Sequence, residues 1–226
     1  MISKNKDAAG SLLILLAGIL WGSMGLFVRR LSALGFDSIQ ITAGRLGFAA
    51  LLFWLLLLLR RPKEERAIRL RDLPLFLGLG LASILFFTVC YFAAIAIMPL
   101  STAAILLYTS PIWVTLLSAL LFHERLTAAK LIALGMAFGG CVLVSGLGGG
   151  LTLRGLLLGL GAGLGYGLYS ILGSIALRRY SPYTVTAWTF LIAGIGALCI
   201  CRPAEMLSLV GESASPAGTV LFFLLT

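Results

Sequence analysis

The stretch Leu75–Met98, LFLGLGLASILFFTVCYFAAIAIM, contains no charged side chain. A hydrocarbon core of about 30 Å takes about 20 helical residues to cross, so this stretch is long enough to span a bilayer. Backbone polar groups in lipid must be satisfied internally, which leaves helices and closed barrels. Because the stretch is continuously apolar and does not alternate, it predicts a transmembrane helix and not a barrel strand.

Similar stretches lie on both sides of it along the chain. The seven expected spans are Ser11–Val28, Ser38–Leu59, Leu75–Met98, Ser101–Phe122, Leu126–Leu147, Leu153–Leu177 and Pro182–Ile200. The apolar remainder, Ala217–Thr226, is too short to cross and predicts a partial eighth span. With 60% hydrophobic and 11% charged residues, no segment is polar enough for a separate soluble domain. The sequence therefore predicts an all-α integral membrane protein, a bundle of seven transmembrane helices plus a partial eighth.

The positions of the basic residues predict the orientation of the chain. With the N-terminus in the cytoplasm, 12 basic residues lie inside and four outside, and Arg45 is counted apart because it lies within a span. Such an inner excess is the rule for multi-pass membrane proteins, so we expect a cytoplasmic N-terminus in the cell (plasma or inner) membrane. The net charge of +9 then faces anionic lipid, and no nucleic-acid partner is expected. The inner residues are Lys4, Lys6, Arg60, Arg61, Lys63, Arg66, Arg69, Arg71, Arg125, Lys130, Arg178 and Arg179, and the outer ones are Arg29, Arg30, Arg154 and Arg202.

A glycine-rich link, residues 148–152, divides the chain into units 1–147 and 153–226. At an offset of 145 residues, the first span matches the sixth at several positions. Ala17 aligns with Ala162, Gly18 with Gly163, Gly22 with Gly167, and Trp21 pairs with Tyr166. A repeat of five helices, an odd number, brings the second copy in from the opposite side of the membrane, as in the inverted repeats of many secondary transporters.

Glycines are spaced for close helix packing in the first and sixth spans. Gly155, Gly159, Gly163 and Gly167 recur every four residues, and Gly18 and Gly22 repeat the spacing. Small residues let helices approach closely in lipid. Two interpretations stay open: static tight packing, or smooth faces along which helices slide or rock during alternating access.

The fourth span carries a stripe of small and polar residues that includes Tyr108 and Pro111, with Thr109 between them. Proline removes a backbone hydrogen bond, so we expect a kink near the middle of the membrane. One interpretation is a kinked packing helix whose hydroxyl groups bond to its own backbone. The other is a cavity wall that meets a substrate at the bilayer midplane.

Arg45 is the charged residue that lies well inside a span, about 10 Å below the outer boundary by helical rise. Intramembrane charges usually face a bundle interior or a water-filled cavity and mark functional sites. Its side chain could instead reach the outer interface. The chain has no acid at matching depth, so a carboxylate partner would come from a substrate, from lipid or from further helices. Aromatic residues inside the spans either pack or line a cavity. They are Trp21, Tyr91, Tyr166, Tyr169 and Trp188.

Signatures of chemistry are lacking in the sequence. The four cysteines lie in apolar spans without metal-ligand spacing, and His123-Glu124-Arg125 lacks the second histidine of a zinc-protease helix. No nucleophile elbow or phosphate-binding loop occurs. We therefore expect no catalytic residue, no metal and no cofactor.

Several short segments together resemble the EamA family of the drug/metabolite transporter (DMT) superfamily. They are Ala17–Gly25, Asp37 followed by Arg45, Tyr108–Pro111, and Phe122–Leu126 before a glycine-spaced helix. The resemblance implies a ten-helix transporter of two inverted five-helix repeats, in which 1–147 is the first repeat and 153–226 an incomplete second. It implies export or exchange of amino acids, related metabolites or drugs by alternating access around a midplane cavity, driven by protons, another coupling ion or exchange.

The resemblance also implies particular residues. Glu124 matches a family marker whose role is structural, and Arg45 matches a commonly basic position of the second helix. The chain departs from the family by ending early, so we expect a C-terminal truncation. A non-transporting membrane subunit or assembly factor is the second hypothesis, and a membrane-embedded enzyme is the third. A homodimer is left open.

Overall fold

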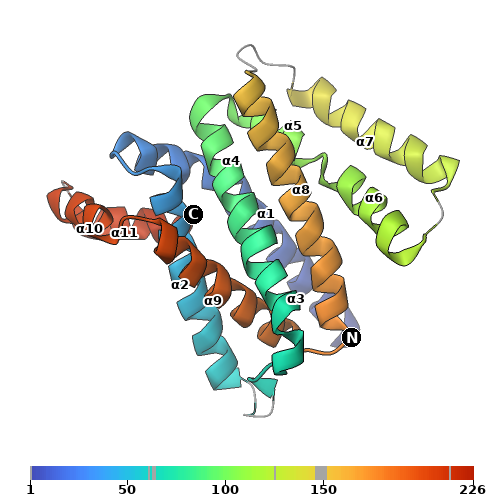
Figure 1. Ribbon diagram of the computed structural model, residues 1–226, viewed down its shortest axis with the longest axis horizontal. Coiled ribbons are helices and arrows are strands. Elements are labelled where there is room, and N and C mark those ends of the chain that lie inside the picture. Colours follow the sequence, from blue (N-terminus) through green and yellow to red (C-terminus); the bar gives the residue numbers. More distant parts are fainter. Residues whose placement is uncertain (1, 61, 63–64, 125, 146–151, 214) are drawn as a thin grey trace.

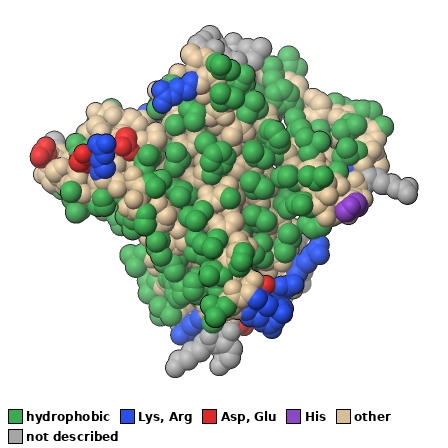
Figure 2. All heavy atoms as spheres, in the orientation of Figure 1, with side chains coloured by type: hydrophobic (Ala, Val, Ile, Leu, Met, Phe, Trp, Pro, Cys, Tyr) green, Lys and Arg blue, Asp and Glu red, His purple; other side chains and the backbone are tan. Residues whose placement is uncertain are grey.

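The computed structural model describes residues 2–60, 62, 65–124, 126–145, 152–213 and 215–226. Six helices in these ranges are long and apolar enough to cross a membrane. Apolar side chains cover most of the face in Figure 2, and Lys and Arg lie mainly toward its edges. The protein is therefore a multi-pass integral membrane protein, as predicted. The six candidate spans are Gly10–Ala33, Ser38–Arg60, Leu70–Ile97, Leu100–Phe122, Leu153–Leu177 and Pro182–Ile200.

Two of the expected spans correspond to shorter helices. The expected fifth span is α7 (Ala128–Ser145), whose apolar part Ala128–Gly140 is below spanning length. The expected start of an eighth span is α11 (Pro216–Leu225). The glycines of the link, residues 148–150, lie outside the described residues. The count of seven spans and a partial eighth stays a prediction.

The four longest spans of the two units are single helices. They are α1 (Ile2–Ala33), α2 (Ser38–Arg60), α8 (Leu153–Leu177) and α9 (Pro182–Ile200). In Figure 1, α1 and α8 run in opposite directions. The third span is built from η2 (Leu70–Asp72), α3 (Leu73–Leu77), the π-helical segment η3 (Gly78–Leu85) and α4 (Phe86–Ile97).

The fourth span is broken where the sequence predicts a kink. Helix α5 (Leu100–Leu107) ends before Tyr108, and α6 (Ser110–Phe122) begins with Pro111 in its first turn. The Thr109 hydroxyl donates to the Leu106 carbonyl at 2.6 Å, and Thr115 donates to the carbonyl of Pro111 at 2.8 Å. The kink is confirmed, and these two hydroxyl groups bond to the backbone of their own segment.

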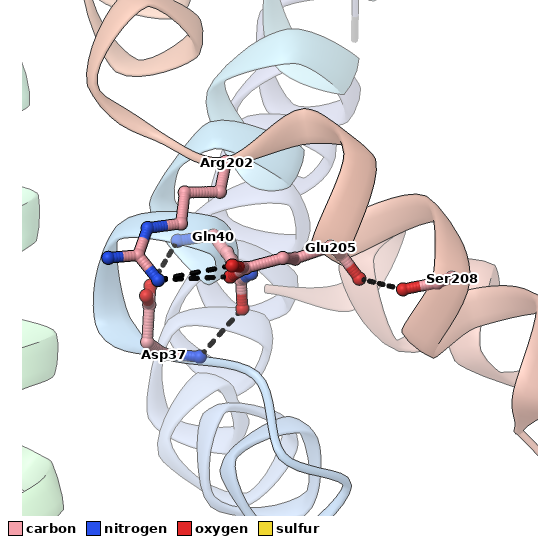
Figure 3. A network of polar contacts seen from close by, with 5 residues as sticks. All are labelled: Asp37, Gln40, Arg202, Glu205 and Ser208. Atoms are coloured by element: carbon pink, nitrogen blue, oxygen red, sulfur yellow. Dashed lines mark hydrogen bonds and ion pairs between the residues drawn. The ribbon is translucent and has the colours of Figure 1, made fainter.

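The start of α2 is fixed by a capping box. The Asp37 N–H donates to Gln40 Oε1 at 3.0 Å, and the Gln40 N–H donates to Asp37 Oδ1 at 2.7 Å. Figure 3 shows this cap next to α10 (Pro203–Glu212), where Arg202 pairs with Glu205 at 3.1 Å. Polar side chains thus gather at this end of the α2 span.

The glycine row of α8 lies against α5 and α6. A Cβ added to Gly159 would lie 2.6 Å from Leu106 Cβ, and one added to Gly163 would lie 3.0 Å from the Leu106 carbonyl oxygen. Contacts with Met98 and Trp113 likewise leave no room for larger residues at Gly155 and Gly167. The close approach expected of these four glycines is therefore present.

The two glycines of α1 behave differently. A Cβ added to Gly18 or Gly22 would meet no atom of the described chain within 4 Å. The close approach expected at these positions is absent from this part of the chain, because the surrounding face of α1 is largely exposed. The glycine spacing alone did not distinguish a packed row from an open one.

A buried carboxylate joins the segment before α3 to the turn between α8 and α9. Arg179 Nη1 donates to Asp72 Oδ1 at 2.7 Å, and the Tyr180 hydroxyl donates to Asp72 Oδ2 at 2.7 Å. The Asp72 side chain is 7% exposed, whereas that of Arg179 is 53% exposed. The Tyr180 hydroxyl also accepts the N–H of Arg69 at 3.1 Å. Asp72 therefore connects two segments more than a hundred residues apart in the sequence.

We expect Asp72→Asn to lower the free energy of unfolding by about 1–3 kcal/mol, because a buried acceptor of charged and neutral hydrogen bonds is replaced by a neutral amide. Thermal unfolding in detergent measures the change. The matched control is Glu205→Gln, which removes an exposed pair with Arg202 and should cost less than about 1 kcal/mol. Equal losses in both variants would contradict a special role for Asp72.

Candidate functional site

A cavity of about 140 Å³ lies between α1 and α2 on one side and α8 and α9 on the other, with η3 and α4 completing its wall. Four residues expected at a substrate cavity, Trp21, Arg45, Tyr166 and Tyr169, line it together. The other lining residues are Leu46, Ile84, Phe87, Thr88 and Phe190. Most of these side chains are aromatic or aliphatic, and no carboxylate is among them.

Arg45 holds the one charged group in the wall of this cavity. Its guanidinium carbon lies 5.9 Å from the centre of the Trp21 ring and 5.6 Å from the centre of the Phe92 ring. Such ring faces attract a cation without using its N–H donors. The Nη1 atom is buried and has no hydrogen-bond partner among the described residues. Arg45 is therefore stabilised by aromatic rings and keeps a donor free.

The aromatic side chains form a connected wall around Arg45. The Trp21 and Tyr166 rings lie 6.4 Å apart, Phe87 and Tyr166 lie 5.4 Å apart, and Tyr166 and Tyr169 lie 6.5 Å apart, all measured between ring centres. Trp21 is 42% exposed and so forms an open edge of this wall. The hydroxyl groups of Tyr166 and Tyr169 make no hydrogen bond within the described chain. The Thr88 hydroxyl is occupied, because it donates to the Ile84 carbonyl at 2.7 Å.

The remaining expected cavity residues lie elsewhere. Tyr91 is buried beside the cavity, with its ring stacked 5.9 Å from that of Phe87. Tyr108 is 54% exposed at the break between α5 and α6, together with Thr109 and Pro111. Trp188 donates its indole N–H to the Arg66 carbonyl at 2.8 Å. These residues serve packing or the helix break in this structure, and they do not line the cavity.

Apolar wall residues were not singled out in the sequence, Phe87 and Phe190 among them. No feature of the sequence separates them from the many other aromatic residues of the spans. One signal was available for Phe190: at the offset of 145 residues it is the counterpart of Arg45. Arg45 and Phe190 also line a second, largely apolar cavity of about 440 Å³ between α2, α9 and α11.

Glu124 lies away from both cavities. Its carboxylate pairs with Lys130 at 3.0 Å, and about half of each side chain is exposed. The pair joins the end of α6 to the start of α7, next to His123, whose backbone φ of 54° ends α6 in the left-handed region. Within the described ranges, no group of His, Cys, Asp and Glu side chains could hold a metal ion.

A model of the EamA-like transporter family matches residues 8–146 and 153–226. The chain belongs to this family. The match covers nearly the whole sequence and is interrupted at the glycine link, so the family identified from the short segments is confirmed.

Three named relatives agree with the family. Two proteins of Archaeoglobus fulgidus called uncharacterized transporters are 33% and 26% identical over 90% and 81% of this chain. The pseudopaline exporter CntI of Pseudomonas aeruginosa is 35% identical over 54% of this chain. The chain spans 69% and 64% of the length of the two archaeal proteins and 40% of that of CntI.

A solved crystal structure shares the fold. It covers 92% of this chain and 77% of its own, with a TM-score of 0.56 and 21% sequence identity. This likeness supports the helical arrangement alone and says nothing of a substrate.

Proposed function

We propose that this EamA-like chain forms the substrate pathway of a secondary transporter that exports or exchanges small metabolites, such as amino acids or drug-like compounds, across the cell membrane. The observation that carries the proposal is the cavity between α1, α2, α8 and α9, where Arg45 keeps a donor free inside an aromatic wall. Ligand sites of secondary transporters lie at the interface of structural repeats, near the bilayer midplane. The charge distribution supports a cytoplasmic N-terminus.

Helix pairing supports an inverted repeat. At the offset of 145 residues, α1 corresponds to α8, α2 to α9, and α11 to residues 71–80 at the start of the third span. Helix α1 packs against α11, and its counterpart α8 packs against η3. Helix α2 packs along its own counterpart, α9, and Trp21 contacts its counterpart Tyr166. Counterparts that meet in this way are expected near a two-fold axis, and we propose that alternating access uses this axis.

Counterflow tests the proposal directly. The purified protein is placed in liposomes loaded with a mixture of amino acids and other small metabolites, and exchange with labelled solutes outside is followed by mass spectrometry. We expect at least one solute to exchange faster than in protein-free liposomes. No flux of any solute would contradict a transport function.

Two tyrosines provide a matched comparison for the position of the site. We expect Tyr166→Ala to reduce flux by about 2- to 10-fold, since it removes a ring and a hydroxyl donor from the cavity wall. Tyr108→Ala should leave flux within about twofold of wild type, because Tyr108 lies outside the cavity and is 54% exposed. Initial rates of counterflow measure both. A larger loss in the Tyr108 variant would place the site at the helix break instead.

A further inference from the structure

We infer that the solute bound in this cavity carries a carboxylate group and that Arg45 binds it. The inference rests on the proposed function above and names the chemistry of its substrate. It follows from the set of hydrogen-bond donors and charges that the cavity presents and from the acceptors that its wall lacks.

The first step is the state of Arg45. Its charge lies against the faces of Trp21 and Phe92, and the buried Nη1 atom has no partner among the described residues. A buried charge in a low-dielectric interior normally has a counter-ion or a full set of hydrogen bonds. The ion pairs of the described residues lie elsewhere, at Glu124, Asp72 and Glu205. The cavity therefore lacks an anion that a bound solute can supply.

The second step is the rest of the cavity wall. The hydroxyl groups of Tyr166 and Tyr169 are free to donate, whereas the Thr88 hydroxyl is already used by its own helix. No Asp or Glu lines the cavity within the described part of the chain. A cationic solute would meet a fixed positive charge and no carboxylate, although aromatic walls alone would suit it. The wall is thus suited to an anion, and it disfavours a cation.

The third step separates a carboxylate from a phosphate group. Phosphate sites usually combine several basic side chains with backbone N–H groups at a helix N-terminus. Here Arg45 is the one basic residue of the wall, and it lies beyond the first four residues of α2, whose N–H groups are the free ones. A guanidinium group matches a carboxylate through two parallel hydrogen bonds. One arginine and two tyrosine hydroxyls therefore fit a carboxylate monoanion.

Matched pairs of solutes test the inference. Liposomes containing the full protein are loaded with amino acids and their carboxamides in equal amounts, together with phosphate monoesters and quaternary amines, and efflux is followed by mass spectrometry. We expect wild type to move each transported acid at least about tenfold faster than its carboxamide. Faster flux of carboxamides, phosphate monoesters or quaternary amines would overturn the inference while leaving the proposed transport function standing. No flux of any solute would overturn both.

Substitutions assign the preference to Arg45. In Arg45→Gln, the ratio of acid flux to carboxamide flux should fall to near one, and Arg45→Lys should keep part of it. A purely structural role would lower both fluxes and leave their ratio unchanged, which would overturn the role of Arg45. If Arg45→Gln does not insert, Tyr166→Phe supplies a second reading, with an expected 2- to 10-fold fall in the ratio. The matched control is Arg30→Gln at the exposed end of α1, which should keep the wild-type ratio.

Discussion

Arg45→Ala is expected to reduce transport by at least about tenfold while the protein inserts normally and unfolds at the same or a higher temperature. A hydrogen bond to a charged group contributes about 1.5–3 kcal/mol, and each 1.36 kcal/mol corresponds to a factor of about ten. The stability should not fall, because the substitution removes a buried donor that has no partner in the described chain. A group kept for function at the expense of stability has this signature.

The measurement pairs counterflow rates with thermal unfolding in detergent. Arg30→Ala, at the exposed end of α1, is the control and should match wild type in both. Unchanged flux in Arg45→Ala would remove Arg45 from the site. A large fall in unfolding temperature together with the flux would make Arg45 a structural residue.

Gly163→Ala is expected to destabilise the protein by about 1–3 kcal/mol, the cost of overpacking a well-packed interior. The added Cβ would lie 3.0 Å from the Leu106 carbonyl oxygen and closer still to Thr109 Oγ1. Backbone at the break between α5 and α6 cannot move aside as a flexible side-chain end would. The same contact would be lost in any rocking of α8 against α5, so transport should fall as well.

The control lies on the same helix. A Cβ added to Gly173 would meet no atom of the described chain within 4 Å, so Gly173→Ala should be neutral or stabilise the protein by up to about 1 kcal/mol through helix propensity. Thermal unfolding of both variants in one detergent makes the comparison. Equal effects would show that the predicted contact at Gly163 does not limit stability.

Most of the fold could be predicted from hydrophobicity. Two of the expected spans, Leu153–Leu177 and Pro182–Ile200, coincide with α8 and α9 to the residue. Polar loops end apolar helices in a membrane, so the boundaries follow from composition. The π-helical segment η3 was not predicted, because nothing in its apolar sequence distinguishes it from an α-helix.

The candidate site could be predicted in part. Arg45, Trp21, Tyr166 and Tyr169 stood out because a charge or a polar aromatic group is unusual in lipid, and they line one cavity. Tyr108 and Trp188 stood out for the same reason and lie outside it. The direction of each side chain depends on how the helices pack, and the sequence pattern of a single span does not contain that information.

Protection of a thiol from alkylation tests the central claim that this cavity holds the substrate. Thr88→Cys in a background with the four native cysteines replaced by alanine places a thiol in the cavity wall, and Thr115→Cys places one outside it. The two positions are matched, since each hydroxyl donates to the carbonyl four residues earlier in the chain. A solute that exchanges in counterflow should slow the reaction of the Thr88→Cys variant with a polar thiol reagent several-fold and leave that of the Thr115→Cys variant unchanged. Equal rates for the Thr88→Cys variant with and without the solute would contradict the account.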